Sequence, residues 1–217
     1  MDFGQLTKAI EQTHSALVVQ ATKSVNICLT LKNWLIGYRI QEYELNGSDR
    51  AVYGQNVIEH LAKELTKQKI PHCSRSRLWD YRHFYKTYPE ILQALPGEFK
   101  HYINHIFKDD EILQSVTGEL MQPEEIQVPR LPITTLFRAL SYTHFVELIK
   151  IEDSLKRSFY EIETVRGNWS SRELKRQIGS LYYERSGLSK NKNELAKFAH
   201  EDAHQLTPKD IIRDPYV

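Results

Sequence analysis

The sequence predicts an all-α fold: a multi-helix domain with a long N-terminal helix or helical hairpin and a helix-turn-helix-like unit. Two observations indicate this fold class. Helix breakers are rare, since the chain has 9 glycines and 8 prolines among 217 residues. Between those breaks, apolar residues recur every three or four positions, which is the period of an α-helical stripe.

The first predicted element runs from Phe3 to about Leu45. We expect one or two long helices here, ended by Asn46-Gly47, because glycine commonly follows the last helical residue. The apolar stripe on which this prediction rests consists of Phe3, Leu6, Ile10, Leu17, Ala21, Val25, Cys28, Leu31, Leu35 and Tyr38.

Two shorter helices should follow, on either side of Pro71. The first should start near Ser48 or Asp49, and the second after Ser74, a favourable N-cap residue, with Pro89 following its end. Two helices with a short join are typical of a helix-turn-helix-like unit. Their predicted core residues are Val57, Ile58, Leu61 and Leu65 in the first helix and Leu78, Tyr81, Tyr85 and Tyr88 in the second.

Residues 96–132 break the helical pattern, because they contain several prolines and glycines and an acidic run without Lys or Arg at 109–126. We interpret 96–132 as an acidic insertion or hairpin-like excursion. Helical spacing resumes at Leu136 and continues, with a stop at Gly167-Asn168, to Gly187. The last helix of this part should open at a capping box, Ser170-Ser171-Arg172-Glu173, and bury Leu174, Ile178 and Leu181.

These elements define the predicted domain organisation. Residues 1–187 should form one helical domain that carries the insertion, and residues 188–217 a C-terminal helix followed by a linker.

Charge and cysteine content exclude several classes of protein. The 29 Lys+Arg and 28 Asp+Glu residues nearly cancel, so the chain is not a uniformly basic histone-like binder. Two cysteines, Cys28 and Cys73, allow one bridge at most, which is too few for a disulfide-stabilised secreted scaffold. No 18-residue apolar window occurs, so we expect a cytoplasmic protein without a membrane partner.

Two basic helix faces are the candidate binding residues. In the helix after Ser74, cations and an aromatic ring lie opposite the apolar face, and in the helix after Ser170, cations lie opposite Leu174. Such faces can hold phosphates, and an exposed aromatic ring can stack on a base. The alternative for both is an ordinary solvated surface. The residues are Arg75, Arg77, Trp79, Arg82, His83 and Lys86 in the first set and Arg172, Lys175 and Arg176 in the second.

Patterns that suggest catalysis or metal binding have poor context. His200-Glu201-Asp202-Ala203-His204 matches the H-E-x-x-H zinc motif, but the 13 residues that follow it contain no His, Glu or Cys that could complete the site. His101 and His105, with Asp109, have ligand-like spacing without a further partner. Glu98-Phe99-Lys100 and Glu173-Leu174-Lys175 match a minimal nuclease pattern without a surrounding strand. We therefore predict no catalytic residue, no metal and no cofactor.

Several sequence blocks, in order, resemble the N-terminal domain of the bacterial YhcG family. They are Trp34-Leu35-Ile36-Gly37-Tyr38-Arg39-Ile40, Tyr53-Gly54-Gln55-Asn56-Val57-Ile58-Glu59-His60-Leu61, the segment from Ser74 to Pro89, Leu140 to Leu148, Phe159-Tyr160-Glu161, Trp169 to Ile178, and Asp214-Pro215-Tyr216-Val217. The resemblance implies a helical domain that helps nucleic-acid recognition and precedes a PD-(D/E)XK nuclease domain.

Two departures from the family pattern bear on function. The chain ends at Asp214-Pro215-Tyr216-Val217, where relatives continue into the nuclease, and the acidic stretch 96–132 is longer than the pattern leads us to expect. We therefore predict a non-catalytic DNA-binding or targeting module whose nuclease domain is absent from this chain. The alternatives are a protein-interaction or homodimerisation module, which would use the stripe from Leu17 through Val25 to Leu35, and a zinc hydrolase that uses His200 and His204.

Overall fold

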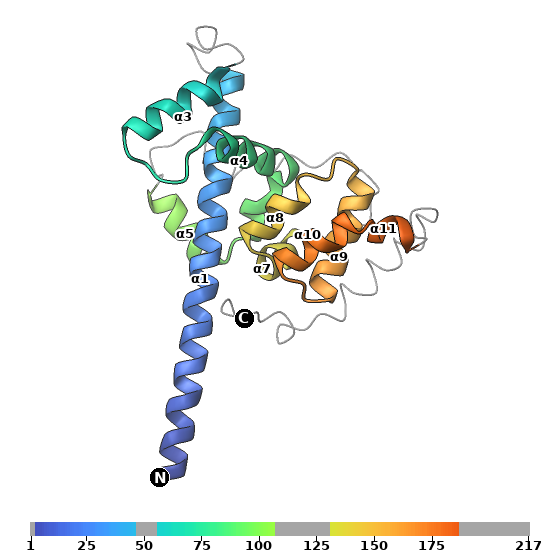
Figure 1. Cartoon of the computed structure of the whole chain (residues 1–217). Coiled ribbons are helices and arrows are strands. Elements are labelled where there is room, and N and C mark those ends of the chain that lie inside the picture. Colours follow the sequence, from blue (N-terminus) through green and yellow to red (C-terminus); the bar gives the residue numbers. More distant parts are fainter. Residues whose placement is uncertain (1–2, 47–55, 107–130, 187–217) are drawn as a thin grey trace.

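The structure is a computed structural model that describes residues 3–46, 56–106 and 131–186. In these residues all regular secondary structure is helical, which confirms the predicted all-α class. Figure 1 shows a long helix, α1, with the other helices gathered around its C-terminal half. The elements are α1 (Phe3–Asn46), α3 (Val57–Lys67), α4 (Arg75–Thr87), the 3-10 helix η2 (Pro89–Ala94), α5 (Gly97–Ile106), α7 (Ile133–Ala139), α8 (Tyr142–Leu148), α9 (Ser154–Arg166), α10 (Ser171–Gly179) and α11 (Tyr182–Arg185).

The first predicted element is one uninterrupted helix rather than a hairpin. Its C-terminal half packs into the body of the protein, where Leu31, Trp34 and Tyr38 are buried. Its N-terminal half extends away from the body (Figure 1), and residues 3–18 are all exposed. The apolar stripe therefore becomes core over only part of its length.

α1 and α4 cross at very close range. Gly37 on α1 faces the carbonyl of Tyr81 on α4, and a Cβ atom built on Gly37 would lie only 1.9 Å from that oxygen. Beside this crossing, Trp34 Nε1 donates a hydrogen bond to the Tyr88 carbonyl at 2.8 Å, and the Trp34 ring meets Tyr85 edge to face. Close backbone approach and aromatic packing together fix α4 on α1.

α3 and α4 form the predicted pair of helices, joined by residues 68–74. The expected start of the first helix near Ser48 lies outside the described residues, and the helix is described from Val57. A small core cluster forms between this pair and α1, and α4 begins after Ser74 as predicted. The buried members of that cluster are Ile40, Ala62, Cys73, Leu78 and Tyr81.

The predicted break at 96–132 is in part helical and contributes to the core. α5 begins at Gly97, and its Ile103 is 5% exposed. Leu131, at the other end of the stretch, is 3% exposed, and both belong to the main core cluster. A proline before a helix is compatible with its first turn, so Pro96 does not interrupt the fold here. Residues 107–130, with the acidic run, lie outside the described part of the chain.

The C-terminal helices follow the predicted periodicity, with one correction. α9 buries Phe159 and Ile162, and α10 buries Leu174, as expected. Leu181, predicted to continue that core face, is 54% exposed and adopts a left-handed conformation with φ of 55°. α10 has already ended at Gly179, so Leu181 lies in the turn before α11.

Candidate nucleic-acid interface

Arg75, Trp79 and Lys86 lie on one outer face of α4. They are separated by four and seven residues, which returns each to the same side of a helix. All three are exposed, and the Trp79 ring is stacked on the His83 ring with centroids 5.0 Å apart and planes 14° apart. These three side chains therefore have the outer position that the helical spacing predicts.

Arg82 and His83 contribute to the fold more than the sequence indicated. Arg82 forms an ion pair with Glu44 of α1 at 2.5 Å, and both side chains are only about one quarter exposed. His83 Nε2 lies 2.9 Å from the carbonyl oxygen of Ile149, just after α8. The two side chains therefore connect α4 to α1 and to the end of α8, and are not directed freely outward as predicted.

Arg77 lies apart from the outer face of α4. It follows Arg75 by two residues, which places it roughly 200° further around the helix. Its guanidinium lies 3.2 Å from Nδ1 of His72, in the loop before α4. The predicted contact set on α4 is therefore divided between two sides of the helix.

A carboxyl group lies next to the outer face of α4. Asp80 follows Trp79 directly, and partial burial raises the pKa of its carboxyl, while Lys150 and other nearby cations act in the opposite direction. This acid weakens the positive field on one side of Trp79. The contribution of α4 to anion binding must therefore come mainly from its ends, at Arg75 and Lys86.

The three predicted cations of α10, Arg172, Lys175 and Arg176, are all exposed, on the side away from buried Leu174. Arg176 is paired with Glu173 at 2.7 Å. The predicted capping box is half formed: Ser170 Oγ accepts from the Glu173 backbone N–H at 3.2 Å. The Glu173 carboxylate accepts instead from Arg176 and Gln177.

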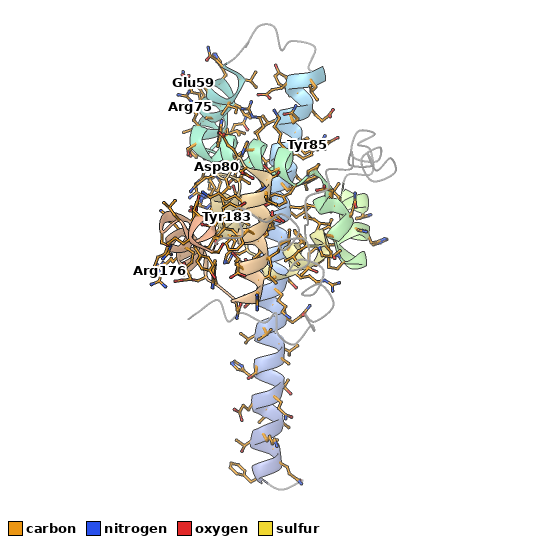
Figure 2. The ribbon with its side chains drawn as sticks, turned by 90° about the vertical axis from the view of Figure 1, so that its right-hand side faces the viewer. Glu59, Arg75, Asp80, Tyr85, Arg176 and Tyr183 are labelled. Carbon is orange, nitrogen blue, oxygen red and sulfur yellow. The ribbon has the colours of Figure 1, made fainter. Side chains whose placement is uncertain are left out.

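α8 connects the two basic helices, because it packs against both α4 and α10. The Tyr142 ring of α8 meets Tyr81 of α4 at a tilted angle and Phe84 edge to face, and His144 Nε2 lies 3.1 Å from the Trp169 carbonyl just before α10. In Figure 2, Arg75 and Arg176 both lie toward the left-hand side of the body. Four of the predicted cations form no ion pair with any described residue: Arg75, Lys86, Arg172 and Lys175.

The sequence analysis did not find the partners that hold these helices in place. Glu44 is 38 positions from Arg82, and the Ile149 carbonyl is 66 positions from His83. A second unpredicted contact lies in the core, where Tyr88 donates to buried Glu161 at 2.7 Å and Arg157 Nε lies 3.9 Å from the same carboxylate. No periodic pattern points to the Arg82–Glu44, His83–Ile149 or Tyr88–Glu161 contacts, because each joins separate parts of the chain. The Arg157–Glu161 pair, in contrast, lies within α9 at i,i+4 spacing.

The described residues contain no group of three His, Cys, Asp or Glu side chains that could hold a metal ion. His101 and His105 are exposed on α5, while Asp109 and the His200–His204 motif lie outside the described residues. Both minimal nuclease patterns, at 98–100 and 173–175, lie on helices. Over the same residues, no helix has an apolar stretch long enough to cross a membrane.

Comparison with known proteins gives two matches. Residues 5–185 match the family described as the DUF1016 N-terminal domain. The chain is also 32% identical, over 228 aligned residues, to the Escherichia coli K12 protein named "Putative nuclease YhcG". That alignment covers 97% of this chain and 56% of the relative, so the chain spans little more than half the length of the relative. No solved structure matches the chain.

Proposed function

The chain belongs to the family of the DUF1016 N-terminal domain, and from this premise we propose that it is the DNA-binding, non-catalytic module of a nuclease-related protein. The similarity to YhcG supports a nuclease-associated module. In the proposal, recognition lies in this chain, and the nuclease chemistry lies in the part of the relative that the alignment does not cover.

The observation that carries the proposal is the pair of basic helices, α4 and α10, that both pack against α8. We define the phosphate surface as Arg75 and Lys86 on α4 together with Arg172 and Lys175 on α10. All four side chains are exposed, and none forms an ion pair with a described residue, although Arg75 lies close enough to Glu59 of α3 to help lower the pKa of that carboxyl. Cations in this state are free to displace counterions from DNA phosphates, which is the main source of sequence-independent affinity.

The two helices are also held rigidly enough to present these cations together. α4 is fixed on α1 by the Gly37 crossing and the Arg82–Glu44 ion pair. α10 is tied to α8 through His144 and the Trp169 carbonyl. Because the supporting contacts are made by other residues, the cations of the phosphate surface are left for a ligand.

Trp79 would supply a second kind of contact. Large aromatic side chains are usually well buried, yet Trp79 is 45% exposed, and its ring is stacked on that of His83. A base could stack on the exposed part of the indole, and such stacking accepts any base. The phosphate surface and Trp79 together favour DNA binding with little sequence preference and with access to unpaired bases.

The proposal is tested by fluorescence anisotropy with a labelled DNA duplex. The two variants are Arg75→Ala/Lys86→Ala and Arg172→Ala/Lys175→Ala. Each should weaken binding by roughly tenfold for any duplex sequence, because phosphate contacts carry no sequence information.

The matched control is Lys100→Ala/Arg138→Ala, which removes two exposed cations from α5 and α7 that form no ion pair with a described residue. Its affinity should stay close to that of the wild type. Equal losses in all three double variants would mean that net charge, and not the phosphate surface, determines binding. Unchanged affinity in both test variants would refute the proposal.

A further inference from the structure

The N-terminal half of α1 carries an apolar stripe that no described residue covers. Figure 2 shows this half of the helix extending alone below the body. Phe3 is 83% exposed, Ile10 60% and Leu17 65%. We define the overhang stripe as the exposed apolar residues that recur along this side of the helix: Phe3, Leu6, Ile10, Leu17, Ala21, Val25 and Cys28.

We propose that the overhang stripe pairs with the same stripe of a second copy of this chain, so that the protein is a homodimer held by two α1 helices. Phe3, Ile10 and Leu17 are seven residues apart, the spacing with which two helices pack knobs into holes along a seam. Around Ile10 the surface has a shallow hollow lined by Ala9, Ile10, Thr13 and His14. A side chain from a facing helix can insert there.

The charges of the overhang leave its stripe free for an identical partner. Its charged residues up to position 23 are Lys8, Glu11 and Lys23. Successive residues of a helix are rotated by about 100°, so each of these three charged residues lies more than about 90° around the helix axis from the line through Ile10 and Leu17. All three therefore point away from the stripe. Two identical copies can therefore approach along the stripe without placing like charges together, as a two-fold interface requires.

The hydroxyl groups beside the stripe already have partners. Thr7 Oγ1 donates to the Phe3 carbonyl at 2.9 Å, and Thr13 Oγ1 donates to the Ala9 carbonyl at 2.8 Å. Both hydroxyl groups would keep these hydrogen bonds if an apolar partner covered them, so burial would not leave their donors unsatisfied. The polar positions next to the stripe are compatible with burial.

The area and position of the stripe fit a second helix. Phe3 to Cys28 spans about 38 Å of helix about 10 Å wide, so pairing would bury several hundred Å² on each copy, near the lower end of specific interfaces. Leu17 lies roughly 100° around the helix axis from buried Trp34, so the stripe faces a different direction from the side of α1 that packs into the body. A partner helix on the stripe would therefore not displace the body. Most helical stability in proteins comes from packing of an apolar face, which gives pairing along this uncovered stripe a clear stabilising role.

The structure also changes which residues of α1 are available for the self-association that the sequence suggested. Leu17 and Val25 are exposed, but Leu35 is half-buried and packs against the main core cluster. Pairing along α1 must therefore end before Leu35, and the available part begins earlier than expected, at Phe3.

The test is the mass of the chain in solution, measured by light scattering during size-exclusion chromatography across a dilution series. The wild type should have about twice the 25.5 kDa mass of one chain. Ile10→Glu/Leu17→Glu should have the mass of one chain. The control Gln12→Glu/Val19→Glu, which adds the same charges at the same spacing on the other side of the helix, should remain a dimer.

Thermal unfolding of the body provides the folding check, because the substituted residues lie on the overhang and should leave the melting temperature of the monomeric body unchanged. A wild type with the mass of one chain would overturn the proposal. So would an Ile10→Glu/Leu17→Glu variant that remains a dimer. DNA binding plays no part in this measurement, so its outcome is independent of the proposed function.

Discussion

A Cβ atom at Gly37 would lie 1.9 Å from the carbonyl oxygen of Tyr81, so the crossing of α1 and α4 depends on a residue without a side chain. The atom that blocks the added methyl group belongs to the backbone of α4 and cannot move away by rotation. The position of α4, and with it one half of the phosphate surface, therefore depends on this contact.

Gly37→Ala should destabilise the fold by about 2–3 kcal/mol, because the two helices must separate to admit the methyl group. For a domain of this size, the expected fall in melting temperature is roughly 5–10 °C. The control is Gly179→Ala, where an added Cβ meets nothing within 4 Å. Circular dichroism melts of both variants check the prediction, and a melting temperature unchanged in Gly37→Ala would contradict the close crossing.

Arg82→Ala should affect stability rather than DNA affinity. Its loss leaves partly buried Glu44 without its cation and should cost about 1–2 kcal/mol. A double-mutant cycle with Glu44→Gln, followed by urea denaturation, measures the coupling between the two residues. A variant with full stability and weaker duplex binding would instead place Arg82 at the interface.

Trp79→Ala should weaken binding to single-stranded DNA by about 1–3 kcal/mol, or roughly 5- to 150-fold, if the indole stacks on one base. Trp79→Phe should retain part of this affinity because it keeps a flat ring. Titration of tryptophan fluorescence with an oligonucleotide gives a direct signal in the wild type, while anisotropy of a labelled oligonucleotide compares the variants. Equal affinities in all three proteins would exclude stacking at Trp79.

The fold should be lost at alkaline pH as its buried tyrosines ionise. Burial raises the pKa of Tyr38 to about 12 and also raises the pKa values of Tyr81 and Tyr85. These folded values lie above the pKa of about 10 for a free tyrosine, so the stability they contribute is complete below about pH 10.

That contribution should then be lost as the pH rises from about 10 toward 12. Tyrosinate absorbance and circular dichroism, followed over this range, should change together for the buried tyrosines. Ionisation of every tyrosine near pH 10 with the helical signal intact would contradict this assignment of burial.

Much of the fold could be predicted from the sequence, because it depends on local periodicity. The stop at Gly167-Asn168 follows from the backbone preferences of single residues. The helix start after Ser74 was also placed correctly, although the Ser74 hydroxyl makes no capping hydrogen bond. The conformation of Leu181 could not be predicted this way, because its apolar side chain fits the stripe of α10 although the helix has already ended.

The candidate site was harder to predict than the fold. Helical spacing correctly placed Arg75, Trp79 and Lys86 on one outer face. It could not show that Arg82 and His83 are engaged, because their partners come from distant parts of the chain. The outer face of a helix can be read from its own sequence, but the contacts that occupy it depend on the neighbouring helices.

The salt dependence of duplex affinity tests the central claim most directly. Counterion release gives a slope of log affinity against log salt concentration of about −0.9 for each phosphate contact on duplex DNA. The variant Arg75→Ala/Lys86→Ala/Arg172→Ala/Lys175→Ala should therefore flatten the wild-type slope by roughly three to four units. A slope equal to that of the wild type would contradict the proposal that these two helices hold DNA.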